Sequence, residues 1–169
     1  RTSAGYDRVQ IDFEIVHPSE GQHFAVYLAL LRRGLPPELE LSVAVPARVR
    51  KINDAYDYDV IARIADRVVI MAYDEHWSGS APGSIASMEW CRRVLDYVLT
   101  TIKKEKVIMG LPFYGRAWAD HKHAKAYKNS TLRTLMQDKK VKKISRSDTV
   151  PWFVYEDTIR VTVYFEDAQ

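Results

Sequence analysis

The chain has 169 residues, of which 47% are hydrophobic and 28% charged, and its formal net charge is +3. This composition excludes fibrous and disordered classes and demands no nucleic acid as a partner. The sequence contains no run of about 18 apolar residues, the length that a membrane-spanning helix needs. The single cysteine, Cys91, excludes a disulfide within the chain.

Buried strands and helices are predicted to alternate over the first 111 residues. Apolar runs predict strands over 8–13, 40–45, 67–73 and 106–111, and helical periodicity predicts helices over 20–34, 58–65 and 85–104. Apolar strands that alternate with helices indicate a parallel sheet covered on both faces, and so an α/β fold. No G-x-G-x-x-G turn follows any of these strands, so a dinucleotide-binding sheet is not expected.

The alternation ends after Leu111, and the tail is predicted to form a small insertion rather than another βα unit. Residues 112–130 have loop character, and residues 131–140 predict a short helix. The runs 152–157 and 160–169 alternate apolar and polar residues across a short connection, which predicts two strands of an antiparallel hairpin.

The stretch YDRVQIDFE, residues 6–14, carries more charge than a buried strand should. Alternate side chains of a strand share a face, so one face is apolar and the other holds Gln10, Asp12 and Glu14. The polar face needs water or a function, because burying unpaired carboxylates is costly. A parallel barrel supplies an answer, since its active site lies at the C-terminal ends of its strands. Glu14, Tyr73 and Asp74 would all stand at such ends.

Asp12 and Glu14 are predicted to lie roughly 6.5–7 Å apart on one strand face. Two carboxylates that close disfavour joint ionisation, which favours keeping one of them protonated near neutral pH. A carboxylic acid in that state can protonate a glycosidic oxygen. A standard glycosidase also needs a second carboxylate across the bond, and Asp12 is poorly placed for that role. The sequence therefore offers one acid, one helper and no evident protein nucleophile.

Four motifs, in the expected order, resemble those of family 18 glycoside hydrolases, which include chitinases. YDRVQIDFE resembles the family's D-G-x-D-x-D-x-E signature and LSVAVPAR its fifth barrel strand. VVIMAYDEHW resembles the sixth strand with its M-x-Y-D motif, and KVIMGLPFYGRAW the seventh with its G-x-P-F-Y-G-R motif. The match covers about residues 5–118, and DEHWSGSAPGSIAS is most similar to the bacterial peptidoglycan and spore-cortex branch.

The resemblance implies a (β/α)8 TIM barrel of which this chain holds only part. Residues 1–111 would supply about strands four to seven, and residues 112–169 an incomplete α+β insertion before strand eight. The implied reaction is retaining and substrate-assisted: the sugar's own 2-acetamido group attacks the anomeric carbon, with no cofactor and no metal.

The resemblance also implies roles for single residues. Glu14 would be the general acid and then the base, and Asp12 would orient the acetamido group. Tyr73 would donate a hydrogen bond to the acetamido oxygen, and Asp74 would support that arrangement. The substrate-binding positions implied with these are Gln10, Met71, Tyr114 and Arg116, and Trp77 and Trp118 are candidates for stacking on sugar rings.

Two positions depart from the family signature. Arg8 stands where the family has glycine, and Gln10 stands where it has the middle aspartate. Gln10 cannot carry a negative charge, so the proton relay behind Asp12 would be weakened or different. A complete barrel has eight βα units in about 250 residues, and a partial one leaves strand edges unpaired. Self-association is therefore one expectation, and the isolated piece is expected to hydrolyse little.

Three functions stay open. The first is a hydrolase of N-acetylglucosamine polymers, either peptidoglycan glycan strands or chitin, with an extracytoplasmic or cell-wall location inferred from that substrate class. The second is a catalytically silent carbohydrate-binding module on the same barrel. The third, a metal-dependent barrel enzyme, has little support: His121 and His123 lack further ligands at a known spacing, and Asp7 has the opposite strand parity to Asp12.

Overall fold

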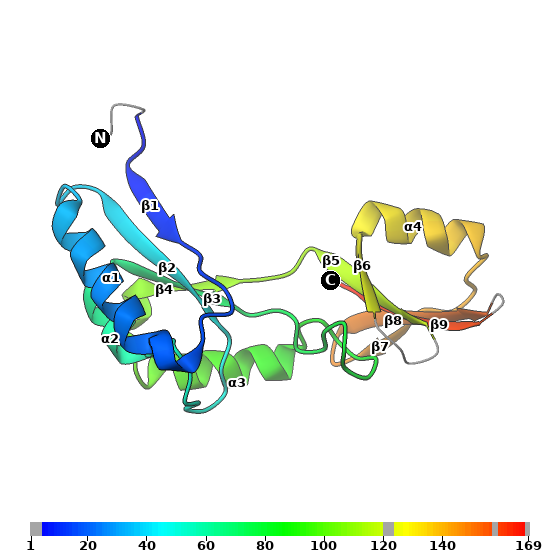
Figure 1. Ribbon diagram of the computed structural model, residues 1–169. Coiled ribbons are helices and arrows are strands. Elements are labelled where there is room, and N and C mark those ends of the chain that lie inside the picture. Colours follow the sequence, from blue (N-terminus) through cyan, green and yellow to red (C-terminus); the bar gives the residue numbers. More distant parts are fainter. Residues whose placement is uncertain (1–4, 120–123, 157–158, 168–169) are drawn as a thin grey trace. The chain divides into compact units, whose positions relative to one another are not determined.

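The computed structural model describes residues 5–119, 124–156 and 159–167 and divides the chain into two compact units (Figure 1). Unit 1 comprises Arg1–Met71 and Arg93–Gly110, and unit 2 comprises Ala72–Arg92 and Leu111–Gln169. Within the described ranges, no helix is both long and apolar enough to cross a membrane.

Unit 1 is built on a parallel sheet of four strands. These are β1 (Arg8–Ile11), β2 (Glu40–Pro46), β3 (Arg67–Met71) and β4 (Val107–Gly110), in the order β1-β2-β3-β4. Each strand pairs in parallel with the next one along the chain, so the four C-terminal ends meet at the same edge of the sheet. The predicted parallel α/β arrangement is confirmed.

Helices connect the strands, as predicted. The first connection is a 3-10 turn, η1 (Pro18–Glu20), followed by α1 (Gly21–Gly34), and the second is α2 (Tyr58–Ile64). The third is α3 (Met88–Leu99), followed by η2 (Lys104–Lys106). Helix α3 is shorter than the predicted 85–104, because Ile85 and Ser87 belong to the loop before it and the Ser87 hydroxyl accepts the Trp90 N–H at 3.2 Å.

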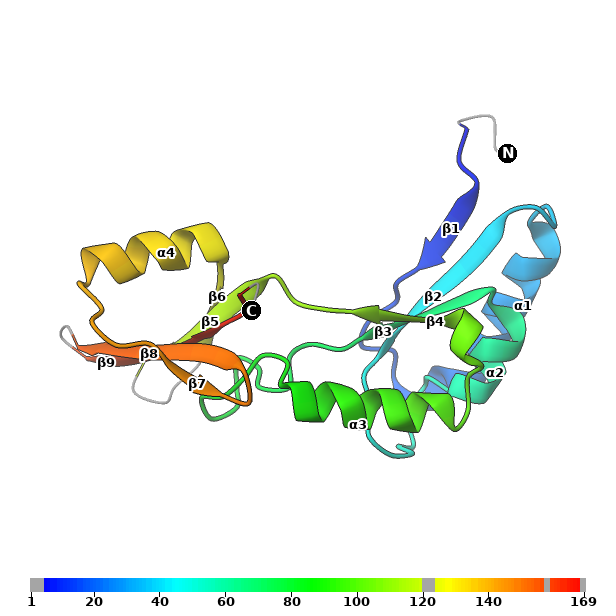
Figure 2. The same cartoon turned by 180° about the vertical axis from the view of Figure 1, so that it is seen from behind.

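Strand β2 lies at the centre of the core of unit 1. Its five residues from Leu41 to Val45 are all buried, which requires cover on both faces of the sheet. Helices α1 and α2 lie beside each other in both views (Figures 1 and 2) and contribute the buried residues Phe24, Leu28 and Ile61.

Unit 2 contains an antiparallel sheet with one helix. The strands are β5 (Tyr114–Ala119), β6 (Ala124–Lys128), β7 (Ser145–Ser147), β8 (Val150–Glu156) and β9 (Arg160–Phe165), in the order β6-β5-β9-β8-β7. Helix α4 (Asn129–Asp138) follows β6. The predicted helix and the β8–β9 hairpin are confirmed.

The predicted loop over 112–130 is wrong, because this segment supplies β5 and β6. Its small residues, such as Ala117 and Ala126, weaken the apolar alternation from which a strand is recognised. Strand β5 instead owes its conformation to its neighbours, since it pairs with β6 on one side and with β9 on the other. Tertiary pairing of this kind overrides local propensity.

One face of the unit 2 sheet packs against α4. The buried cluster there consists of Ala117, Leu132, Phe153, Val161, Val163 and Phe165. Gly115 allows the close approach of helix and sheet: a Cβ atom at this position would lie 2.5 Å from the Leu132 side chain and 2.5 Å from the Tyr164 carbonyl oxygen.

We expect Gly115→Ala to destabilise the protein by about 1–3 kcal/mol, the usual cost of overpacking. Backbone cannot move aside as a flexible side chain can, and one of the two clashes is with backbone. Gly34→Ala is the control, because Gly34 ends helix α1 and a Cβ atom added there would have no atom within 4 Å. Denaturant titration of both variants checks the prediction; equal unfolding free energies would contradict it.

Candidate active site

The residues predicted to form the catalytic site are divided between the two units. Gln10, Asp12, Glu14 and Met71 belong to unit 1. Unit 2 holds the remaining predicted residues, Tyr73, Asp74, Trp77, Tyr114, Arg116 and Trp118.

In unit 1, the two candidate carboxylates follow directly after a strand end. Strand β1 ends at Ile11, two residues earlier than predicted, so Asp12 and Glu14 lie beyond the sheet ladder, and both are exposed. Inside the strand the predicted alternation is confirmed, since Ile11 is buried and Gln10 is exposed. The Gln10 side-chain oxygen accepts a hydrogen bond from the Ser42 hydroxyl of strand β2 at 3.4 Å.

The side chain between the two carboxylates turns toward helix α1. The Phe13 ring stacks on Phe24 and Tyr27, with centroid distances of 6.0 and 5.4 Å. This confirms the prediction that the apolar face of the stretch, to which Phe13 belongs, packs against a helix. Asp12 and Glu14, on either side of Phe13, are left exposed to solvent.

Strand β3 leads into the second group of candidates. It ends at the half-buried Met71, which pairs in register with Gly110 of β4. Tyr73 and Asp74 follow, and Asp74 adopts a left-handed backbone conformation with φ of 59°. Aspartate tolerates this conformation better than most residues.

In unit 2, the Asp74 carboxylate holds two side chains of strand β5. Arg116 donates from Nη2 to both carboxylate oxygens, at 2.8 and 2.9 Å, and from Nε at 3.1 Å. The Tyr114 hydroxyl donates to Oδ1 of the same carboxylate. Because the bidentate pairing fixes the plane of the guanidinium, the arrangement is rigid as well as charged.

Tyr114 is held on several sides. The Tyr73 ring meets it edge-on at a centroid distance of 6.5 Å, and the Arg116 guanidinium carbon lies 5.7 Å from its ring centroid. Burial raises the pKa of Tyr114, and its hydrogen bond to Asp74 raises it further. The phenol is therefore a protonated donor at physiological pH. The structure thus brings together four of the predicted residues: Tyr73, Asp74, Tyr114 and Arg116.

The two tryptophan candidates differ. The Trp77 side chain is 56% exposed and remains available for stacking on a ring. Trp118 is fully buried, with its ring edge-on to Tyr164, so the prediction that it stacks on a sugar is wrong. Its indole N–H donates to the Ser80 carbonyl oxygen at 3.0 Å, which anchors the loop that carries Trp77.

Two further carboxylates in unit 2 were not predicted to matter. Glu75, next to Asp74, accepts the Ser87 N–H at 2.8 Å, and its own N–H donates to the Ile85 carbonyl oxygen at 2.9 Å. Glu166, just after β9, accepts the Ala86 N–H. Both carboxylates therefore hold the loop between β3 and α3. Spacing along the sequence gave no signal that these two residues meet the same loop.

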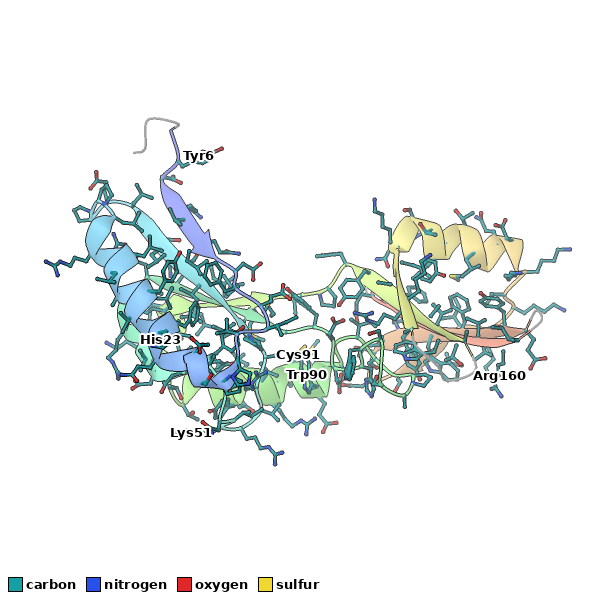
Figure 3. The ribbon with its side chains drawn as sticks, viewed as in Figure 1. Tyr6, His23, Lys51, Trp90, Cys91 and Arg160 are labelled. Carbon is teal, nitrogen blue, oxygen red and sulfur yellow. The ribbon has the colours of Figure 1, made fainter. Side chains whose placement is uncertain are left out.

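The environment of Glu166 changes its acidity. The pKa of Glu166 is raised to about 7, mainly by burial and to a smaller extent by the negative charges of Asp167 and Glu75. Burial likewise raises the pKa of Cys91 to about 11, so this thiol, on helix α3 beside Trp90 (Figure 3), is protonated at neutral pH and unsuited to act as a nucleophile.

His121 and His123 lie outside the described residues. In the parts of the chain that the structure does describe, no group of three or more His, Cys, Asp or Glu side chains is arranged to hold a metal ion.

We expect Asp74→Ala to lower the free energy of unfolding by about 1–3 kcal/mol, because it leaves the partly buried donors of Tyr114 and Arg116 without their acceptor. The Arg116 side chain is only 13% exposed, so water cannot fully replace the carboxylate. Asp138→Ala, at the exposed end of α4, is the matched control and should change stability by less than about 0.5 kcal/mol. Denaturant titration measures both, and similar losses would refute the assignment.

The raised pKa of Glu166 predicts a pH dependence of stability. Its carboxyl keeps a proton in the folded chain that the unfolded chain releases near its ordinary pKa of 4.5. Its favourable contribution is therefore complete below about pH 4.5 and is lost as the pH rises to about 7. Relative to Glu166→Gln, the parent should lose stability across this window, measured by urea midpoints at several pH values. Glu156→Gln, exposed at the end of β8, should follow the parent.

The chain is similar in sequence to known proteins. The chain is 37% identical over 119 residues to the uncharacterized glycosylase YvbX of Bacillus subtilis, and the match covers 67% of this chain and 35% of that protein. It is 27% identical over 178 residues to the cortical fragment-lytic enzyme of Bacillus anthracis, and the match covers 98% of this chain and 41% of that protein.

A solved structure is also similar. The crystal structure of a chitinase from Chromobacterium violaceum aligns with a TM-score of 0.87 at 27% identity, and the alignment covers 95% of this chain and 54% of that one. The chain thus spans between 35% and 54% of the length of these three proteins. The prediction of a partial TIM barrel is confirmed.

The family model for glycosyl hydrolases family 18 matches residues 2–169, nearly the whole chain. The parallel sheet of unit 1, with its strands in chain order, agrees with that match. The chain belongs to glycosyl hydrolases family 18 and forms part of its TIM barrel.

Proposed function

We propose that the protein is a retaining hydrolase of β-linked N-acetylglucosamine polymers in which the substrate's own acetamido group acts as the nucleophile. The observation that carries the proposal is the pair Asp12 and Glu14, two exposed carboxylates directly after the C-terminal end of a parallel strand. Active sites of TIM barrels lie at this end. Membership of family 18 supports the same chemistry.

In the proposed mechanism, Glu14 protonates the glycosidic oxygen and later takes a proton from the attacking water. Asp12 orients the acetamido group for attack on the anomeric carbon. Tyr73 donates a hydrogen bond to the acetamido oxygen. No carboxylate across the bond is required, since the nucleophile comes from the substrate.

Tyr114 and Arg116 would line the sugar site before the cleaved bond, and Asp74 would support the arrangement of Tyr73 and the acetamido group. The Asp74 carboxylate accepts hydrogen bonds from Arg116 and Tyr114, so it holds both side chains in place. Preorganised polar groups of this kind need little rearrangement during the reaction. Gln10 and Met71 are proposed to contact substrate from the barrel strands, and Trp77 to stack on a sugar ring.

Peptidoglycan glycan strands are the proposed substrate, with chitin as the second choice. The similarity to the cortical fragment-lytic enzyme of Bacillus anthracis supports the first, and the similarity to a chitinase supports the second. From this substrate class alone we infer an extracytoplasmic or cell-wall-associated location. Activity is assigned to the complete barrel, in which residues 1–111 are barrel and residues 112–169 belong to the insertion.

The isolated piece is proposed to have little activity and to self-associate. Among the described strands of unit 1, β1 pairs only with β2 and β4 pairs only with β3. Each of these edge strands therefore keeps backbone groups that another strand can pair with.

A catalytically silent carbohydrate-binding module is the second candidate, and Gln10 favours it. Gln10 stands where the family signature has an aspartate, and its side-chain oxygen accepts from Ser42. An amide cannot supply negative charge behind Asp12. A binding module would keep the sugar contacts and lack turnover.

Glu14→Gln in the protein with its complete barrel tests the function. We expect the parent to cleave N-acetylglucosamine oligomers or peptidoglycan and the variant to lose at least about a hundredfold in kcat, as expected for the loss of a general acid. Glu105→Gln, exposed in η2 before the start of β4, is the control and should retain activity.

Three outcomes separate the alternatives. A thiazoline mimic of the cyclised acetamido intermediate should inhibit the parent, whereas a chelator should have no effect. Binding of both parent and Glu14→Gln to the oligomers without cleavage by either would establish the binding module instead. Loss of activity with chelator would require a metal-dependent mechanism.

A further inference from the structure

The backbone around Glu14 is held by one buried hydroxyl group in unit 1. The Tyr56 hydroxyl donates to the Phe13 carbonyl oxygen at 2.7 Å and accepts the Val16 N–H at 3.2 Å. One oxygen atom therefore joins the residue before Glu14 to the residue two positions after it. Tyr56 is only 8% exposed, so solvent does not readily replace it in either bond.

This segment needs such support, because it has none from the sheet. Strand β1 ends at Ile11, and the ladder to β2 ends with it. Ile15 adopts a left-handed conformation with φ of 56°, and its side chain is 96% exposed. The left-handed conformation is unfavourable for a β-branched residue, and such strain persists only where surrounding contacts impose it.

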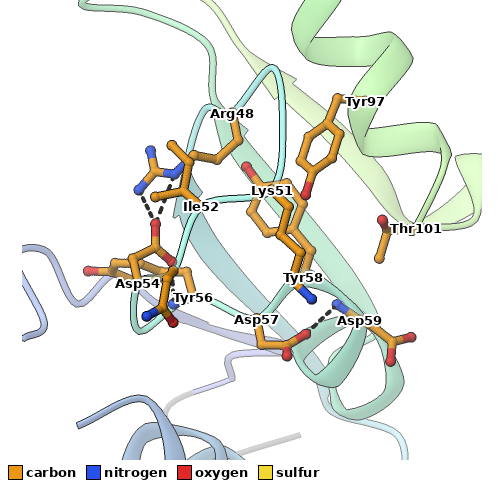
Figure 4. Close-up of a pocket in the computed structure, with 11 residues that line it drawn as sticks. Arg48, Lys51, Ile52, Asp54, Tyr56, Asp57, Tyr58, Asp59, Tyr97 and Thr101 are labelled. Atoms are coloured by element: carbon orange, nitrogen blue, oxygen red, sulfur yellow. Dashed lines mark hydrogen bonds and ion pairs between the residues drawn. The ribbon is translucent and has the colours of Figure 1, made fainter. Parts of the chain in front are cut away.

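Tyr56 is itself held by an ion pair. Its N–H donates to Asp54 Oδ1 at 2.9 Å, and the other carboxylate oxygen accepts from Arg48 Nε at 2.9 Å and Nη2 at 2.5 Å (Figure 4). Arg48 also donates from Nη1 to the Ala47 carbonyl oxygen at 2.9 Å. The Phe24 ring of α1 meets the Tyr56 ring edge-on at 5.8 Å.

The order of the strands explains how these residues come to lie beside the segment that carries Glu14. Arg48, Asp54 and Tyr56 lie on the loop between β2 and α2, and β2 is the neighbour of β1. They line a hollow of about 280 Å³. The loop after one strand therefore supports the segment after the adjacent strand.

We propose that Tyr56 is a positioning residue for Glu14: its hydroxyl fixes the backbone on both sides of the acid, and the Arg48–Asp54 pair fixes Tyr56. The catalytic part of this inference rests on the proposed function of Glu14. An acid displaced by about 1 Å can lose about a hundredfold in rate. Loss of the hydroxyl should therefore lower kcat and leave substrate binding almost unchanged.

The chain offers a closely matched control. Tyr58 lies two residues further along, is 6% exposed, and donates its hydroxyl to the Pro46 carbonyl oxygen. Tyr58→Phe removes a buried hydroxyl of the same kind and leaves a carbonyl without its donor, as Tyr56→Phe does. The hydrogen bond and the ring contact of Tyr58 go to Pro46 and Tyr97 rather than to residues 12–16, so the variant reports what the stability loss alone does to activity.

The experiment compares Tyr56→Phe and Tyr58→Phe in the protein with its complete barrel. Two quantities are measured: kcat and KM on N-acetylglucosamine oligomers, and the hydrogen exchange rate of the Val16 amide by NMR. For Tyr56→Phe we expect kcat to fall about tenfold or more, KM to change by less than about threefold, and the Val16 amide to exchange at least about tenfold faster. Tyr58→Phe should change each quantity by less than about threefold.

The results distinguish failure of the clamp from failure of the proposed function. The clamp is the pair of hydrogen bonds by which the Tyr56 hydroxyl holds Phe13 and Val16. An unchanged exchange rate of the Val16 amide in Tyr56→Phe would show that the clamp does not hold this backbone, whether or not the parent is active. Faster exchange with unchanged kcat would overturn its catalytic role, as would equal losses of kcat in the two variants. A parent that turns over no substrate removes the catalytic role together with the proposed function, and the exchange rates still report the clamp.

Discussion

The parallel register of β1, β2, β3 and β4 is the constraint on which the rest of unit 1 depends. Because each strand pairs with the next in the same direction, everything that follows a strand emerges at one edge of the sheet. The carboxylates after β1 and the loop with Tyr56 after β2 are neighbours for this reason alone. A reversed strand would send one of them to the opposite edge, and the hydrogen bonds of Tyr56 would be lost.

Beyond the strand ends, where the backbone hydrogen bonds of the sheet stop, single polar side chains hold the chain in place. In unit 1 the Tyr56 hydroxyl holds residues 13 and 16, and in unit 2 the Asp74 carboxylate holds Tyr114 and Arg116. In both places a residue with a left-handed backbone lies at the turn, Ile15 in one and Asp74 in the other. Strain of this kind is concentrated at functional sites and is stabilised by the surroundings.

The sequence predicted what depends on local pattern. The run 40–45 nearly coincides with β2, and the parity of Gln10, Ile11 and Phe13 is the one found. It failed where partners distant in sequence decide: β5 exists through pairing with β9, and burial of Trp118 comes from packing against Tyr164. Aromatic residues stack on ligands and fill cores equally well, so composition alone gave no means of separating Trp118 from Trp77. The contacts of Tyr56 with Phe13 and Val16 span about 40 residues and leave no periodic signal.

The hydrogen bond from Trp118 to Ser80 has a consequence for the interpretation of mutational scans. The Ser80 hydroxyl accepts the Trp77 N–H at 3.0 Å, and the Ser80 carbonyl oxygen accepts the Trp118 indole N–H. The exposed Trp77 and the buried Trp118 are therefore linked through one residue. A substitution of Trp118 would also displace the exposed Trp77 side chain. If Trp77 stacks on a sugar as proposed, substitutions at both positions would lower carbohydrate affinity, although only Trp77 is exposed. Affinity data without a measure of folding would assign a contact surface to a residue that lies wholly inside the protein.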